Sequence, residues 1–191
     1  MHTYITAVCC VPYHSPHDTL MSTTHSLSVT RSFLSWQCMA PFNAYLTLMG
    51  TETLALRMDR HVENALTIAK WLDAHDAVTW VSYAGLRKSK YYDLAQKYMP
   101  LGAGSVFTFG VKGGFEAGIK IVEGCNLVSH LANVGDVRSL ILHPASTTHR
   151  QLSEEQRLVA GAGPDVIRLS VGLESAEDII ADLDQALRNS Q

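Results

Sequence analysis

The chain has 191 residues, of which 47% are hydrophobic and 17% are charged, so it is long enough to bury the core of a single compact domain. Its net charge of −3 and its scattered Lys and Arg residues form no basic face, so we expect neither nucleic acid nor a membrane as a partner. No apolar run approaches the roughly 20 residues of a spanning helix, and the four cysteines form no disulfide pattern, so we expect a cytoplasmic protein.

Residues 1–38 differ in composition from the rest of the chain. They are rich in His, Ser and Thr, contain one acidic residue, Asp18, and show no apolar period. We expect residues 1–38 to be a disordered or aberrant leader and residues 39–191 to be the folded domain. Zinc prefers thiolate and imidazole ligands, but adjacent cysteines do not match the usual spacing, so we expect no metal site here. The residues concerned are Cys9, Cys10, His14 and His17.

Two helices are predicted at the start of the folded part. Residues 43–49 suit a short helix that is broken at Gly50, and residues 51–75 suit a long amphipathic helix. Apolar residues recur at helical spacing at Leu54, Met58, Val62, Leu66 and Ala69.

Strands and helices alternate from residue 78 onward. Strands are predicted at residues 78–81, 105–110, 139–142 and 166–171, and helices at residues 91–98, 113–123 and 175–187. A further helix begins at Ser153, because Ser153 and Gln156 have the spacing of a capping box, and Ser175 suits the N-cap of the last helix. This order predicts an α/β or α+β domain with one sheet flanked by helices.

Arg168 stands in the middle of the apolar strand 165–171. A strand alternates its faces, so Arg168 shares a side with Val166 and Ser170. A buried guanidinium needs an anionic partner, and its planar fork suits a carboxylate. The partner is either an internal Asp or Glu in a structural ion pair, which is the more common case, or the carboxylate of a substrate. The pattern alone does not decide between them.

Residues 133–149 place many small polar groups between two short apolar runs. Such a loop can line a pocket for a small zwitterion, because hydroxyl and amide groups orient polar ligands. His143 and His149 lie in this segment, but no carboxylate or thiol lies at a helpful spacing. We therefore expect ordinary loop histidines here and not a metal pair or a general base.

Five segments resemble the Cys/Met-metabolism family of pyridoxal phosphate (PLP) enzymes, and they occur in the order of that family. The HLANVGD and HPASTTH forms look like its O-acetylhomoserine sulfhydrylase branch. The segments are PFNAYL at 41–46, LRMDRH at 56–61 with ENA at 63–65, SHLANVGD at 129–136, SLILHPASTTH at 139–149 and RLSVGLE at 168–174.

The resemblance implies the small C-terminal domain of a fold-type I enzyme, preceded in the complete enzyme by a large PLP domain. Members of this branch replace the acetate of O-acetylhomoserine by sulfide and form homocysteine, with PLP as the electron sink. By the RLSVG match, Arg168 binds the substrate α-carboxylate. By the SL match, Ser139 lies beside the substrate and the catalytic lysine, and Thr148 lies at the pocket wall.

The lysine that carries the cofactor has no counterpart in this sequence. The family places it after a Ser-x-Thr motif in the large domain, and Ser89-Lys90-Tyr91 imitates that motif only superficially. We therefore expect the chain alone to hold no PLP covalently and to be inactive. The six lysines are Lys70, Lys88, Lys90, Lys97, Lys112 and Lys120.

Two alternatives remain open at this stage. The chain can be a non-catalytic module that docks on an intact homologue or on a separately encoded PLP domain, or it can be a fragment of a related cystathionine or methionine γ-lyase. In a complete enzyme we expect O-acetylhomoserine as the substrate and either a homo-oligomer or the large PLP domain as the protein partner.

Overall fold

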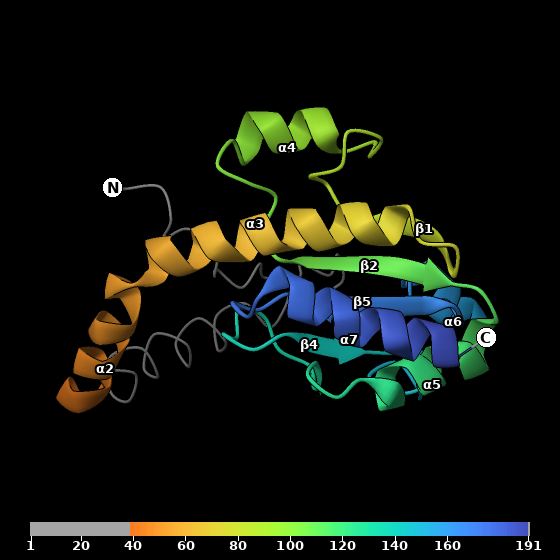
Figure 1. The fold of residues 1–191 in the computed structure, drawn as a ribbon. Helices are drawn as coiled ribbons and strands as arrows, with labels where there is room; N and C mark the ends of the chain where they lie inside the picture. The colour runs from red at the N-terminus through yellow and green to blue at the C-terminus, as the bar shows by residue number, and fades with distance from the viewer. Residues whose placement is uncertain (1–38, 191) are drawn as a thin grey trace, which may run out of the picture. The chain divides into compact units, whose positions relative to one another are not determined.

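The computed structural model describes residues 39–190 (Figure 1). The expected leader and the cysteine and histidine residues at 9–17 lie outside the described residues. The chain divides into two units, Met1–Met49 and Gly50–Gln191. In the described part, no helix is both long enough and apolar enough to cross a membrane.

Two helices open the described part, and the break between them lies later than predicted. α2 spans Pro41–Glu52 and α3 spans Leu54–Asp73, so the interruption falls at Thr53 and not at Gly50. Gly50 has no positive φ and continues the helix. The prediction of a break at Gly50 was wrong because a glycine lowers helix propensity without preventing helical geometry.

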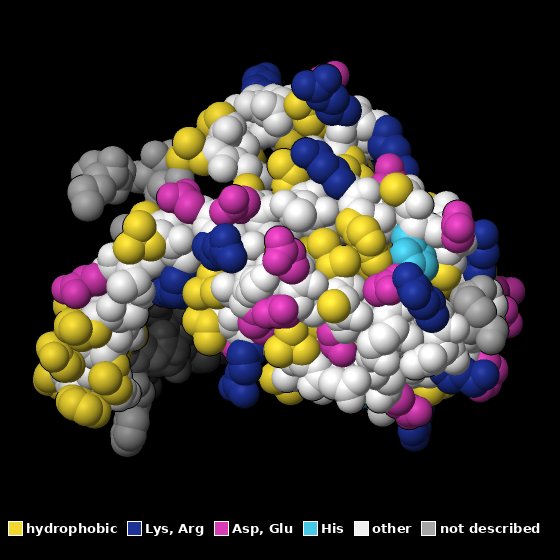
Figure 2. Space-filling view, in the orientation of Figure 1, with side chains coloured by type: hydrophobic (Ala, Val, Ile, Leu, Met, Phe, Trp, Pro, Cys, Tyr) yellow, Lys and Arg dark blue, Asp and Glu magenta, His cyan; other side chains and the backbone are white. Residues whose placement is uncertain are grey.

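α2 is rich in apolar residues and has no buried residue. Figure 2 shows hydrophobic side chains gathered over this helix. Its exposed large hydrophobic residues are Phe42, Tyr45, Leu46, Leu48 and Met49.

A five-stranded sheet organises the rest of the chain. The strands are β1 (Val78–Ser82), β2 (Val106–Val111), β3 (Ser129–His130), β4 (Leu140–Leu142) and β5 (Val166–Ser170). Their order across the sheet is β1-β2-β5-β4-β3, and all neighbours are antiparallel except β3 and β4. The central strand, β5, is therefore the last one in the sequence.

Helices pack against one face of the sheet and enclose the core. α7 (Ala176–Asn189) contacts α3 and α5 (Gly114–Gly124), and Figure 1 shows α7 crossing in front of β5 and β4. Ile167 and Leu169 are fully buried in this core, so Arg168 lies on the opposite face of β5, as the alternation predicts. One sheet flanked by helices confirms the predicted α/β class.

Two short helices complete the fold. α4 spans Tyr92–Tyr98, and α6 spans Glu154–Val159. The predicted capping box is confirmed, because the Ser153 hydroxyl accepts from the Gln156 N–H and the Gln156 side chain accepts from the Ser153 N–H. Ser175 occupies the N-cap position of α7 as predicted, but its side chain makes no capping hydrogen bond.

Candidate functional site

Arg168 lies between Thr108 of β2 and Leu142 of β4 and is partly buried. Its Nη2 donates to the Asn133 carbonyl oxygen at 3.3 Å. Within residues 39–190, no Asp or Glu oxygen lies within 4.0 Å of this guanidinium. The structural ion pair that the strand pattern left open is therefore not formed in the described part, and most of the five guanidinium N–H donors have no partner there.

Asn133, whose backbone carbonyl contacts Arg168, also has a polar side chain. The Asn133 Oδ1 accepts from the Val134 N–H at 2.8 Å, which fixes the side chain against its own loop. The Asn133 amide NH₂ has no hydrogen-bond partner in the described part, and the residue is exposed. The sequence places Asn133 in a polar loop but indicates no role for it, because nothing in its spacing shows that the loop reaches Arg168.

Ser139 is 0% exposed and is bonded on all sides by protein groups. Its hydroxyl donates to Glu174 Oε2 at 2.9 Å and accepts from the Gly172 N–H at 2.9 Å, while its backbone N–H donates to Glu174 Oε1 at 2.7 Å. The hydroxyl proton is therefore already donated within the chain. Its direct neighbours are residues of the turn that follows β5.

The turn at residues 171–174 is also held from α3. His61 Nδ1 donates to the Val171 carbonyl at 2.7 Å, and Asn64 Nδ2 donates to the carbonyls of Gly172 at 3.1 Å and Glu174 at 2.8 Å. A Cβ at Gly172 would lie 2.5 Å from the backbone of Arg138 and of Ser139, so only glycine fits this position. Three segments that resemble the PLP family therefore meet in one network at the end of β5.

Thr148 lies in a different place from Ser139. Ser139 directly precedes β4, whereas Thr148 follows the other end of that strand by six residues. Thr148 is exposed, and its Oγ1 lies 2.8 Å from His149 Nδ1. No hydrogen bond or ion pair in residues 39–190 joins Thr148 to Arg168 or Ser139, and its place in a pocket wall stays a prediction.

Both ring nitrogens of His143 are hydrogen-bonded within the protein. Its Nε2 donates to the Pro164 carbonyl at 2.9 Å, and its Nδ1 accepts from the Ser146 hydroxyl at 2.9 Å. Burial lowers the pKa of His143, and the nearby Arg157 charge lowers it further, against opposing effects of the Pro164 hydrogen bond and the Asp165 charge. Among the residues described, no group of three or more His, Cys, Asp or Glu side chains is arranged to hold a metal ion.

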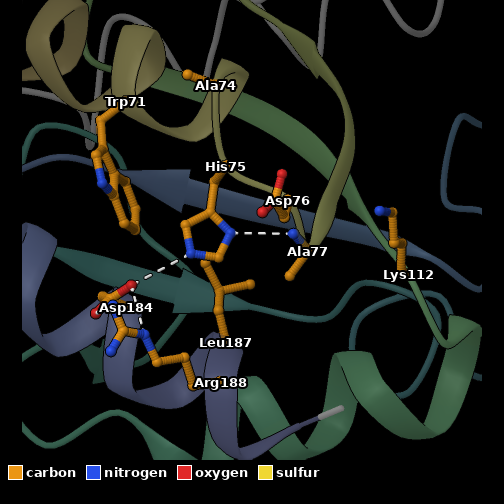
Figure 3. Close-up of a pocket in the computed structure, with 9 residues that line it drawn as sticks. All are labelled: Trp71, Ala74, His75, Asp76, Ala77, Lys112, Asp184, Leu187 and Arg188. Atoms are coloured by element: carbon orange, nitrogen blue, oxygen red, sulfur yellow. Dashed lines mark hydrogen bonds and ion pairs between the residues drawn. The ribbon is translucent and has the colours of Figure 1, made fainter.

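Another cavity of the described part lies away from these residues. It measures about 610 Å³ and lies at the C-terminal ends of α3 and α7, where Figure 3 shows the His75 ring beside Trp71 with one ring nitrogen directed at Asp184. His75 Nε2 lies 3.2 Å from Asp184 Oδ1, and His75 Nδ1 accepts from the Ala77 N–H at 3.1 Å. Both ring nitrogens are engaged and no predicted site residue lines this cavity, so we do not place the site there.

The lysines do not provide a cofactor site. All six are exposed. Lys90, in the segment that imitates the cofactor motif, lies over the Tyr91 ring with its Nζ 4.8 Å from the centroid, and Lys88 pairs with Asp73. In the described part, no hydrogen bond or ion pair joins a lysine to Arg168 or Asn133. In the described part these exposed lysines do not fit the enclosed lysine that holds PLP covalently.

Comparison with known proteins gives a consistent result. The family model described as Cys/Met metabolism PLP-dependent enzyme matches residues 24–188, so the match begins within the segment that the sequence analysis left unmatched. The chain is 52% identical over 151 residues to O-acetyl-L-homoserine sulfhydrylase 1 of Thermus thermophilus, covering 79% of this chain and 36% of that relative. It is 50% identical over 147 residues to the homocysteine synthase of Schizosaccharomyces pombe, covering 77% and 34%.

A solved structure shows the same arrangement. A Campylobacter jejuni protein described as an O-acetylhomoserine (thiol)-lyase, crystallised with a pyridoxyl-lysine monophosphate, matches with a TM-score of 0.77 and 41% identity. The match covers 89% of this chain and 41% of that one. The chain spans about a third of the length of the curated relatives it matches.

Proposed function

We propose, because this chain belongs to the Cys/Met metabolism PLP-dependent enzyme family, that it is the substrate-carboxylate-binding domain of an O-acetylhomoserine sulfhydrylase. The observation that carries the proposal is the partly buried Arg168 guanidinium, which has no carboxylate partner in the described part. The relatives named as sulfhydrylases and homocysteine synthase support acetylated homoserine as the substrate and sulfide as the incoming group.

In this proposal Arg168 binds the α-carboxylate through two parallel charge-assisted hydrogen bonds. The backbone carbonyl of Asn133 contacts Arg168, and in the proposal the unpaired side-chain NH₂ of Asn133 donates a further hydrogen bond to the same carboxylate. PLP, when bound in the complete enzyme, supplies the electron sink for the chemistry. The residues of this chain bind and orient the substrate so that its acetylated end faces the reacting groups.

Ser139 takes a different role in the proposal from the one expected by resemblance. Its hydroxyl already donates to Glu174, and the residue is fully buried, so we assign the direct contact to Asn133. Ser139 then acts as a positioning residue, because it joins the start of β4 to the turn that follows β5. Thr148 keeps its predicted place at the pocket wall.

We also propose that the chain by itself forms no homocysteine. All six lysines are exposed, which favours a cofactor lysine supplied by another part of the complete enzyme or by a partner. Docking on a large PLP domain or on a second copy is then a requirement for activity. The interaction module that the sequence left as an alternative is therefore compatible with this proposal.

The test replaces the corresponding third of the Thermus relative with residues 39–190 of this chain. In this complete enzyme, Arg168→Lys should lower kcat/KM for O-acetylhomoserine by roughly 10- to 100-fold, since a charge-assisted bond is worth about 1.5–3 kcal/mol. The melting temperature should stay unchanged. Arg150→Lys is the control, because Arg150 is exposed and its side chain has no hydrogen bond or ion pair in the described part. Normal kinetics with a lowered melting temperature would contradict the carboxylate assignment.

A further inference from the structure

A second cavity, of about 290 Å³, lies apart from the residues assigned to the carboxylate site. It is formed by α6, the first turn of α5, the segment after β4 and the segment before β5. Its lining residues are Phe115, Ala145, Glu154, Arg157, Ala162 and Pro164. None of them has a role in the function proposed above.

Arg157 brings an incompletely bonded guanidinium to this cavity. Its Nη1 donates to the Ala145 carbonyl at 3.3 Å, but its Nε is buried and has no hydrogen-bond partner in the described part. No carboxylate among residues 39–190 lies within 4.0 Å of it. A buried donor without a partner is destabilising, and an acceptor that enters the cavity would supply the missing partner.

Glu154 brings the opposite charge to the same cavity. Glu154 and Arg157 are three residues apart, so they lie on the same side of α6. The same spacing gives an ion pair at 3.5 Å between Arg60 and Glu63 in α3, but Glu154 and Arg157 do not pair. An anionic group and a cationic group therefore line one cavity without neutralising each other.

The remaining wall is apolar and well fixed. The Phe115 ring packs edge-on against His143, with the ring centroids 5.1 Å apart, and Ala162 is buried beside it. Ligand cavities usually measure about 300–1,000 Å³, so this one suits a small ligand. Its chemistry combines a site for a carboxylate, a site for an ammonium group and a surface for a short aliphatic chain.

We propose that this cavity binds a small, free aliphatic α-amino acid. The carboxylate accepts hydrogen bonds from the Arg157 guanidinium, including the buried Nε–H. The ammonium group donates to the Glu154 carboxylate, and the aliphatic side chain lies on Phe115, Ala162 and Pro164. A zwitterion fits this site better than a simple anion because both charges of the cavity are then paired.

The experiment is an NMR titration of the full 191-residue chain, which needs no cofactor or second domain. L-valine is compared with isovalerate, which lacks the ammonium group, and with isobutylamine, which lacks the carboxylate. L-valine should give saturable shifts at Phe115, Ala162 and the Arg157 Nε–H with a Kd near the millimolar range, at least about tenfold tighter than either analogue.

Substitutions at Glu154 and Arg157 test the two charged contacts one at a time. Glu154→Gln should weaken L-valine binding about tenfold, whereas Glu155→Gln, a neighbouring acid outside the cavity, should leave it unchanged. Arg157→Gln should abolish L-valine binding. Arg157 also donates to the Ala145 carbonyl, so this variant can fail to fold. In that case the comparison of Glu154→Gln with Glu155→Gln tests the proposal.

Three results would overturn the proposal. The first is an absence of saturable shifts up to about 50 mM L-valine. The second is equal affinity for isovalerate, which would reduce the site to a general anion site. The third is binding lost in Arg168→Lys but kept in Glu154→Gln, which would place the ligand at the carboxylate site. Failure here leaves the proposed function intact, since that rests on Arg168.

Discussion

Two regions border Arg168: the turn at residues 171–174, which follows it in the chain, and the loop at residues 133–138, which supplies its hydrogen-bond partner. In the turn, the Glu174 carboxylate and the carbonyls of residues 171, 172 and 174 all accept hydrogen bonds from buried side chains or from Ser139. In the loop, the side-chain NH₂ of Asn133 has no hydrogen-bond partner in the described part. The same holds for most N–H donors of the neighbouring Arg168. Side chains that complete their hydrogen bonds internally should set stability, and side chains with unpaired donors should set binding.

The strongest test of this comparison uses another internally bonded carboxylate. Asp182 of α7 is buried and accepts from the backbone N–H groups of Asn126, Leu127 and Val128 at 2.8–3.0 Å. Burial raises the pKa of Asp182, but these hydrogen bonds and one from Gln185 outweigh it, and the net pKa is lowered. Asp182→Ala leaves three backbone donors unpaired, so the free energy of unfolding should fall by at least about 3 kcal/mol in a denaturant titration.

Asp184→Ala is the matched control for Asp182. Asp184 lies on the same helix but pairs with the side chains of His75 and Arg188 near the surface. Partly exposed ion pairs contribute about 0–1 kcal/mol, so this variant should be far milder. If both variants lost the same free energy of unfolding, the backbone hydrogen bonds of Asp182 would contribute no more to stability than the surface ion pairs of Asp184.

A paired substitution next to Arg168 has a smaller expected effect. Ser139→Ala leaves the Gly172 N–H and one Glu174 oxygen unpaired in a buried place, so the free energy of unfolding should fall by about 2–3 kcal/mol. Asn133→Ala should change it by less than about 0.5 kcal/mol, because Asn133 is exposed. In the complete hybrid enzyme, Asn133→Ala should raise KM for O-acetylhomoserine. A large stability loss for Asn133→Ala would remove the distinction between the turn and the loop.

The smallest expected effect is a pH dependence from His143. Its pKa is lowered in the folded chain from the ordinary value of 6.5, so the unfolded chain binds more protons as the pH falls through that value. The free energy of unfolding should therefore fall from pH 7.5 to pH 5.5, by at most about 1.4 kcal/mol per pH unit for this group.

Thermal melts at a series of pH values compare wild type with His143→Gln. The variant should show a flatter profile over the same range, while His130→Gln, at an exposed position, should follow wild type. Asp182 stays ionised throughout, since its pKa lies below its ordinary value of 3.8. Identical profiles for wild type and His143→Gln would show that protonation of His143 is not coupled to unfolding.

Local sequence patterns predicted most elements of the fold. The alternation in strand 165–171 placed Arg168 opposite the core, and the capping box placed the start of α6, because both depend on residues close together in the chain. β3 was missed because it has two residues and is defined by its partner, β4.

The site was harder to predict than the fold. Arg168 was proposed as a site residue because a charge within an apolar strand is visible in the sequence. Asn133 received no role, since its contact with Arg168 joins residues 35 positions apart. The bonding of Ser139 to Glu174 also spans 35 positions, so the sequence could not show that its hydroxyl is already paired.

The position of β5 at the centre of the sheet affects how the chain acquires its site during synthesis. β5 pairs with β2 on one side and β4 on the other, although both precede it in the sequence. Until residues 166–170 leave the ribosome, β2 and β4 each present an unpaired edge, which is a hazard for aggregation. Closing the sheet requires contacts across about 60 residues, so it should be a slow step in folding. The strand that carries Arg168 therefore completes the sheet and brings in this proposed binding residue in a single late event.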